Sequence, residues 1–128
     1  MKKLLPFFLI FTVSGCSLVE TDSDDLNGKW EWVHSYGGFA GQTLTPETEG
    51  YRQQLIFYGG RYYILARDGE TIRKGLYNYT KPEIAGQKRP AIEFESDNWE
   101  TFYEISNDTL FFSPNCRDCF FDTYARKQ

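Results

Sequence analysis

Apolar and polar residues alternate along most of the chain after Gly28, so that side chains two positions apart share the same character. This period of two is typical of β-strands with one buried face. The alternating segments are rich in Tyr, Phe, Trp, Ile and Val, and no stretch sustains the 3.6-residue period of a long helix. The pattern predicts eight strands, at residues 29–35, 53–58, 61–67, 71–79, 91–95, 99–106, 109–113 and 119–126.

Short turn sequences join these expected strands. Gly59-Gly60 and Asp68-Gly69 predict two-residue hairpins, because both pairs adopt positive φ easily. Asp97-Asn98, Asn107-Asp108 and Pro114-Asn115 predict further turns. Consecutive strands joined in this way are antiparallel neighbours, and eight of them close into an up-and-down β-barrel without exposed edges. The expected fold is therefore an all-β, eight-stranded antiparallel up-and-down barrel.

The first expected strand carries Trp30, Trp32 and His34 at every second position, which predicts that all three face the barrel interior. His34 is either a hydrogen-bonded histidine of the barrel or a polar anchor at the mouth of a cavity. The glycine-rich connection at residues 36–52 is either a lid over that mouth or an adaptable surface loop. We expect a ligand, if the interior is open, to contact Trp32, His34, Phe57 and Tyr62.

The N-terminus reads as a targeting segment. Lys2 and Lys3 precede an apolar run of about ten residues, which is too short to span a bilayer as a helix. Val13-Ser14-Gly15-Cys16 resembles the lipobox of bacterial lipoproteins, which implies cleavage before Cys16 and acylation of that residue. We therefore expect a signal peptide at 1–15, a lipidated Cys16 with a flexible acidic tether at 16–27, and a barrel domain at 28–128.

Location follows from the same resemblance. The residue after Cys16 is Ser17 and not Asp, which by similarity to Gram-negative sorting rules favours the outer membrane, with the periplasmic or surface face left open. The expected partner is thus the membrane, through the lipid anchor.

Charge and composition narrow the functional classes. The chain carries 14 Lys and Arg against 18 Asp and Glu, a net charge of −4, and no expected strand bears a basic stripe. Nucleic acid is therefore not an expected partner. The chain has one histidine and no cluster of acid, base and nucleophile, so we expect neither an enzyme nor a cofactor or metal site.

Cys116 and Cys119 form a C-x-x-C spacing in a turn between two expected strands. A redox dithiol would need a following helix, and a zinc site would need further ligands, for which His34 is the one other candidate. A disulfide across the turn is the favoured interpretation, with free thiols as the next alternative.

Two ends of the chain together resemble the lipocalins, and more closely the small lipocalin-like lipoproteins of Bacteroidetes. Gly28-Lys29-Trp30 is similar to the G-x-W that opens the lipocalin barrel, and Tyr124-Ala125-Arg126 is similar to its late arginine. The resemblance implies that the guanidinium of Arg126 lies across the indole of Trp30 and closes one end of the barrel. It also implies a binding role for a small apolar molecule.

Aromatic residues make up 18% of the chain. They either fill a solid barrel core or line a cavity for a hydrophobic or aromatic ligand. The first case favours a structural or protein-interaction module of the cell envelope. The second favours non-catalytic binding of a small hydrophobic or aromatic ligand, which is the function we expect.

Overall fold

A computed structural model describes residues 26–128, which are mostly strands. The expected signal peptide, Cys16 and the tether as far as residue 25 lie outside the described residues. In chain order the elements are β1 (Gly28–Gly37), β2 (Gln42–Leu44), α1 (Pro46–Glu49), β3 (Gln53–Tyr58), β4 (Tyr62–Arg67), β5 (Glu70–Thr80), β6 (Glu83–Ile84), β7 (Gln87–Lys88), β8 (Ala91–Phe94), β9 (Trp99–Ser106), β10 (Thr109–Pro114) and β11 (Phe120–Lys127).

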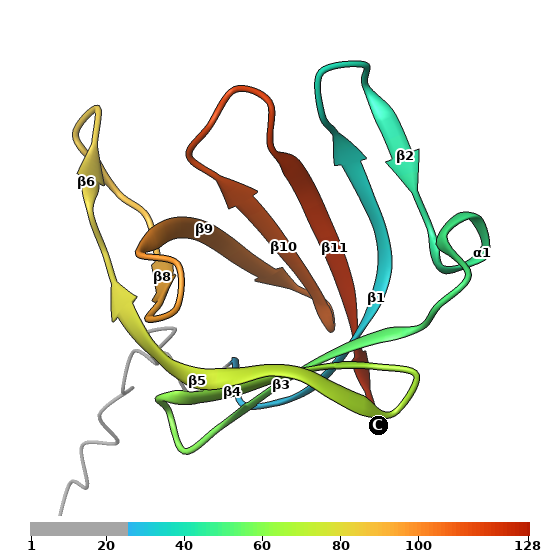
Figure 1. Ribbon diagram of the computed structural model, residues 1–128. Coiled ribbons are helices and arrows are strands. Elements are labelled where there is room, and N and C mark those ends of the chain that lie inside the picture. Colours follow the sequence, from blue (N-terminus) through green and yellow to red (C-terminus); the bar gives the residue numbers. More distant parts are fainter. Residues whose placement is uncertain (1–25) are drawn as a thin grey trace, which may run out of the picture.

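Eight strands form one closed antiparallel barrel, in the order β1, β3, β4, β5, β8, β9, β10, β11. The last strand returns to the first, with Lys29 opposite Lys127 and Gly37 opposite Phe120, and Figure 1 shows β11 in red alongside β1 in blue. The short β2 extends the sheet beside β1, and β6 and β7 form a separate hairpin. The expected fold class is confirmed, and the closed barrel is consistent with a lipocalin-like architecture.

Two hairpin turns match the expected sequences, and two others differ in their bounds. Pro114, expected to begin a turn, is the last residue of β10 and pairs with Thr101. Asp68-Gly69 and Asn107-Asp108 each join their strands as two-residue turns, with positive φ at all four residues. The turn at Gly59-Gly60 is one residue longer than expected, because Arg61 also belongs to it.

One end of the barrel, where β1 begins and β11 ends, is filled with side chains and is called the closed end below. Its largest fully buried side chains are those of Leu26, Trp30, Phe57, Tyr77, Ile92 and Leu110. The Trp30 indole Nε1 donates a 2.7 Å hydrogen bond to the Leu26 carbonyl, so this buried donor is satisfied. The aromatic residues of this half therefore serve as core.

Arg126 covers the closed end. Its guanidinium carbon lies 4.2 Å from the centre of the Trp30 ring, as the resemblance implies. Its Nη1 donates to the Asn27 carbonyl at 3.1 Å, and its Nε lies 3.3 Å from the Asp108 carboxylate. The contact thus joins the first strand, the last strand and the turn between β9 and β10.

Replacing Arg126 with alanine is expected to lower the free energy of unfolding by about 1–2 kcal/mol, because a cation–π contact and a hydrogen bond are lost together. The measurement is urea unfolding followed by circular dichroism. Lys127→Ala is the matched control, since Lys127 is the exposed next residue, and it should change the free energy by less than about 0.5 kcal/mol. Equal effects of the two substitutions on the free energy of unfolding would contradict a stabilising role of Arg126.

Candidate functional site

A β-bulge in β1 changes which side chains reach the interior. The register with β11 shifts after Trp32, so that Trp32 lies opposite Tyr124 and His34 lies opposite Thr123. Tyr124 is buried in the core, so Thr123, its neighbour along the strand, faces outward together with His34. The expectation that His34 continues the inward row is wrong, because the extra residue Val33 reverses the alternation beyond it.

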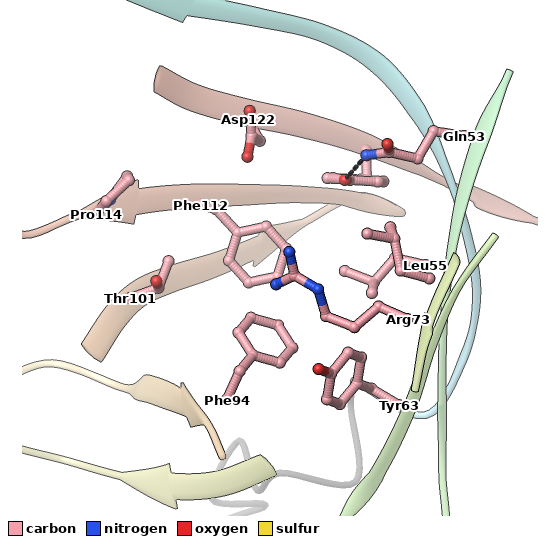
Figure 2. A pocket seen from close by; sticks show the side chains of 11 residues that line it. Gln53, Leu55, Tyr63, Arg73, Phe94, Thr101, Phe112, Pro114 and Asp122 are labelled. Atoms are coloured by element: carbon pink, nitrogen blue, oxygen red, sulfur yellow. Dashed lines mark hydrogen bonds between the residues drawn. The ribbon is translucent and has the colours of Figure 1, made fainter. Parts of the chain in front are cut away.

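A cavity of about 190 Å³ lies inside the half of the barrel away from the closed end, and we call it the mouth cavity. It is lined by Gln53, Leu55, Tyr63, Leu65, Arg73, Phe94, Thr101, Phe112, Pro114, Asp122 and Tyr124 (Figure 2). Strands β9, β10 and β11 supply one wall, β3, β4 and β5 supply the opposite wall, and β8 lies between them. The barrel interior is thus filled at one end and open at the other.

None of the four residues expected to contact a ligand lines the mouth cavity. Phe57 is buried below it, with its ring 6.4 Å from that of Phe94. Tyr62 is 40% exposed and stacks on Tyr58 outside the barrel, so its expected inward position is wrong. The next residue, Tyr63, faces inward instead, and two consecutive tyrosines left the choice of face open to sequence reasoning.

Trp32 is buried and is the first member of a hydrogen-bonded series. Its indole Nε1 donates to the Ser35 hydroxyl at 2.8 Å, and that hydroxyl donates to the Asp122 carboxylate. Ser35 is 6% exposed, and the bulge places it inward, opposite Asp122. Trp32 therefore orients the hydroxyl that holds Asp122, which itself lines the cavity.

Asp122 is the acidic group of the mouth cavity, and sequence reasoning missed it. Burial raises its pKa above the ordinary value of 3.8, while the hydrogen bond from Ser35 and the charge of His34 lower it. The signal was present, because Asp122 shares the inward face of the last strand with Tyr124, two positions away. An acidic residue at an inward position of a barrel strand points to a polar function of the interior.

Asp122→Asn is expected to raise the free energy of unfolding at neutral pH by about 1 kcal/mol. A carboxyl group whose pKa is raised by folding contributes stability below the pKa of the unfolded chain, and that contribution is lost as the pH rises through the folded pKa. An asparagine side chain does not ionise, so it loses no stability as the pH rises, and it still accepts the Ser35 hydrogen bond. The gain should vanish below about pH 4 in urea unfolding series, whereas Asp118→Asn, at an exposed position, should change the free energy by less than about 0.5 kcal/mol at pH 7. A destabilised Asp122→Asn at pH 7 contradicts this.

Beside Asp122, Tyr124 takes part in a second polar series. Gln53 donates from Nε2 to the Tyr124 hydroxyl at 2.9 Å, and Arg67 donates from Nε to the Gln53 side-chain oxygen Oε1 at 2.9 Å. Burial, together with the charge of Asp122, raises the pKa of Tyr124 above its ordinary range. The phenol therefore stays protonated at physiological pH and acts as a neutral polar group of the wall.

The loop between β8 and β9 is tied to the opposite side of the mouth. Arg73 donates from Nη1 to the Asp97 carboxylate at 2.7 Å, and the Tyr63 hydroxyl lies 3.0 Å from that of Ser96. Arg73 extends from β5 across the cavity (Figure 2). Its charge is balanced by the Asp97 carboxylate at the rim. Both members of this ion pair are nearly half exposed, and such pairs contribute little stability.

The glycine-rich connection at 36–52, expected to be either a lid or an adaptable surface loop, contains regular secondary structure. It contains β2 and the single-turn helix α1, which begins after a capping box at Thr45 and ends at Glu49, followed by Gly50 with a left-handed φ of 75°. Tyr51 then stacks on Trp32 with ring centres 5.7 Å apart. No residue of this connection lines the mouth cavity, so the structure does not place it as a lid.

Cys116 and Cys119 form a disulfide in the loop between β10 and β11. Gly37 lies against this loop, and a Cβ there would stand only 2.4 Å from the Cys119 carbonyl oxygen.

Within residues 26–128, no group of three or more His, Cys, Asp or Glu is arranged to hold a metal ion. In the same part of the chain, no helix is long and apolar enough to cross a membrane.

Comparisons with known proteins return no relative. No protein-family model matches the chain, and no curated protein or solved structure shows significant similarity to it. The chemistry of the mouth cavity therefore carries the functional argument.

Proposed function

We propose that this protein is an exported, lipid-anchored lipocalin-like protein that binds a small hydrophobic or aromatic ligand in its barrel without catalysing a reaction. The single observation that supports this most is the mouth cavity of about 190 Å³. Small-molecule sites are mostly apolar hollows with a few convergent polar groups. Leu55, Leu65, Phe94 and Phe112 supply such walls, and Asp122 supplies a polar group.

Size limits the ligand. An apolar protein cavity of about 150 Å³ accepts one benzene molecule. The mouth cavity is slightly larger, so it holds a single ring with a short substituent.

Ethylbenzene is a direct probe for this proposal. We expect NMR shift changes at Leu55 and Leu65 of the purified full chain in lipid nanodiscs, where no detergent competes for the cavity. Leu65→Phe, which narrows the cavity, should weaken the affinity at least about tenfold. Ile64→Phe is the matched control, because Ile64 pairs with Ile56 on the outer face, and it should leave the affinity within about twofold. No shift changes, or equal weakening by both variants, would contradict ligand binding.

The lipid anchor has a separate test. Mass spectrometry of the protein extracted from bacterial membranes should give an N-terminal peptide that begins with an acylated Cys16. Cys16→Ser should lose both the acyl mass and membrane retention. A mature product that begins at another residue would contradict the anchor.

A second candidate function, docking of an envelope protein, is favoured by aromatic side chains outside the barrel. Tyr36, Phe111 and Phe121 are 40–54% exposed on the outer face of β1, β10 and β11, and Tyr36 pairs with Phe121. Exposed apolar groups gathered in this way are typical of interaction sites. A photo-crosslinking residue at Phe121 should give a discrete adduct in envelope membranes, and the same residue at Tyr58 should not.

A further inference from the structure

Asp122 is the one acidic side chain among the lining residues of the mouth cavity, and the structure records no ion pair for it within residues 26–128. One carboxylate oxygen accepts the Ser35 hydrogen bond. The other oxygen has no hydrogen bond recorded in the described part of the chain. Charged groups in protein interiors are normally paired with an opposite charge, so Asp122 is an acceptor that a ligand can complete.

The two arginines near the mouth are directed to other groups, and His34, whose charge acts on Asp122, lies on the outer face with its Nε2 3.4 Å from the Thr123 hydroxyl. Arg73 is paired with Asp97, and Arg67 lies over the Tyr51 ring, 4.3 Å from its centre, while donating to Gln53. The cavity thus has the Asp122 carboxylate inside and, at its rim, the Arg73–Asp97 ion pair, whose charges cancel. This arrangement favours a positive or hydrogen-bond-donating ligand group over a negative one.

Aromatic rings stand beside the carboxylate. Phe112 is the cross-strand partner of Asp122, and its ring packs edge-on against Tyr124 with centres 5.9 Å apart. An ammonium group next to Asp122 would therefore lie near ring faces and edges as well as the carboxylate, and aromatic faces attract cations. Phe94 and Leu55 would hold the apolar body of the same ligand.

We propose that the mouth cavity recognises small arylalkyl amines, with the ligand ammonium on the Asp122 carboxylate and the ring among Leu55, Phe94 and Phe112. This inference rests on the proposed binding function and names its ligand class. The Trp32–Ser35–Asp122 series fixes the carboxylate before the ligand arrives, which reduces the ordering that binding requires. Burial raises the pKa of Asp122, and an ammonium group beside it would act in the opposite direction.

The experiment compares four probes of similar shape on the full chain in nanodiscs: 2-phenylethylamine, 2-phenylethanol, phenylacetate and ethylbenzene. Affinities come from NMR titration of the cavity-lining leucines. We expect the amine to bind at least about tenfold more tightly than the alcohol, and phenylacetate to bind most weakly. Asp122→Asn should reduce amine affinity about tenfold or more, and cooperative urea unfolding of the variant at pH 7 shows that it is folded.

Asp118→Asn removes the same charge from an exposed loop position and should change none of the affinities by more than about twofold. Amine binding no tighter than alcohol binding, or equal losses in Asp122→Asn and Asp118→Asn, would overturn the assignment of Asp122 while ligand binding stands. Absence of binding by all four probes, ethylbenzene included, would overturn the proposed function itself.

Discussion

Replacing Trp30 with alanine is expected to lower the free energy of unfolding by about 3–5 kcal/mol, the range found for large-to-small aromatic substitutions in cores. Trp30 is fully buried, donates to the Leu26 carbonyl and carries the Arg126 guanidinium on its ring. Its removal would leave a void at the closed end and strip both contacts at once. Domains of this size have a total stability of about 5–15 kcal/mol, so the loss is a large fraction.

Urea unfolding followed by far-ultraviolet circular dichroism is the measurement, because the substitution removes a fluorophore. Val33→Ala is the control from the same strand, since Val33 is 43% exposed at the bulge, and it should cost less than about 0.5 kcal/mol. A shift of the midpoint with an unchanged denaturant slope would show that stability alone has changed. A Trp30→Ala cost below about 1.5 kcal/mol would contradict a packed closed end.

The strands could be predicted from sequence because period-two alternation is a local property. All eight expected segments correspond to barrel strands, and their bounds differ from those of the structure by at most two residues at either end. Turn chemistry at Asp68-Gly69 and Asn107-Asp108 set the order of neighbours. Once eight antiparallel neighbours follow one another, barrel closure pairs the first strand with the last, and the resemblance to lipocalins implied the contact between Trp30 and Arg126.

The site could not be predicted in the same way, because the facing of a strand depends on its partner. The bulge beyond Trp32 is a property of the β1–β11 register, and its one extra residue moves His34 out and Ser35 in. Tyr62 and Tyr63 are chemically equal, so the sequence does not indicate which of them faces inward. Asp122 was the exception, since its place between Phe120 and Tyr124 already indicated the inner face.

Aromatic side chains fill one half of the barrel interior and line a hollow in the other half. At the closed end, rings such as Trp30 and Tyr77 fill the interior. At the mouth, Phe94 and Phe112 line a hollow instead. Composition alone does not separate these uses, because the same residue types serve both, and position along each strand decides between them.

Replacing Ser35 with alanine is expected to lower the free energy of unfolding by about 2–3 kcal/mol at pH 7. The hydroxyl accepts from the buried Trp32 indole and donates to Asp122, so its loss leaves a buried donor and a charged acceptor without partners. The hydrogen bond lowers the pKa of Asp122, so the variant should also raise that pKa further. The cost should then shrink below about pH 4, where the carboxyl is protonated in both states.

Urea unfolding at pH 7 and at about pH 3.5 measures both effects. Ser106→Ala is the matched control, since Ser106 is an exposed serine at the end of β9, and it should change the free energy by less than about 0.5 kcal/mol at either pH. In an Asp122→Asn background, Ser35→Ala should cost less than in the wild type, because a neutral acceptor loses less than a charged one. A Ser35→Ala cost that matches Ser106→Ala, or that is the same in both backgrounds, would show that Ser35 does not hold the Asp122 carboxylate in the cavity wall.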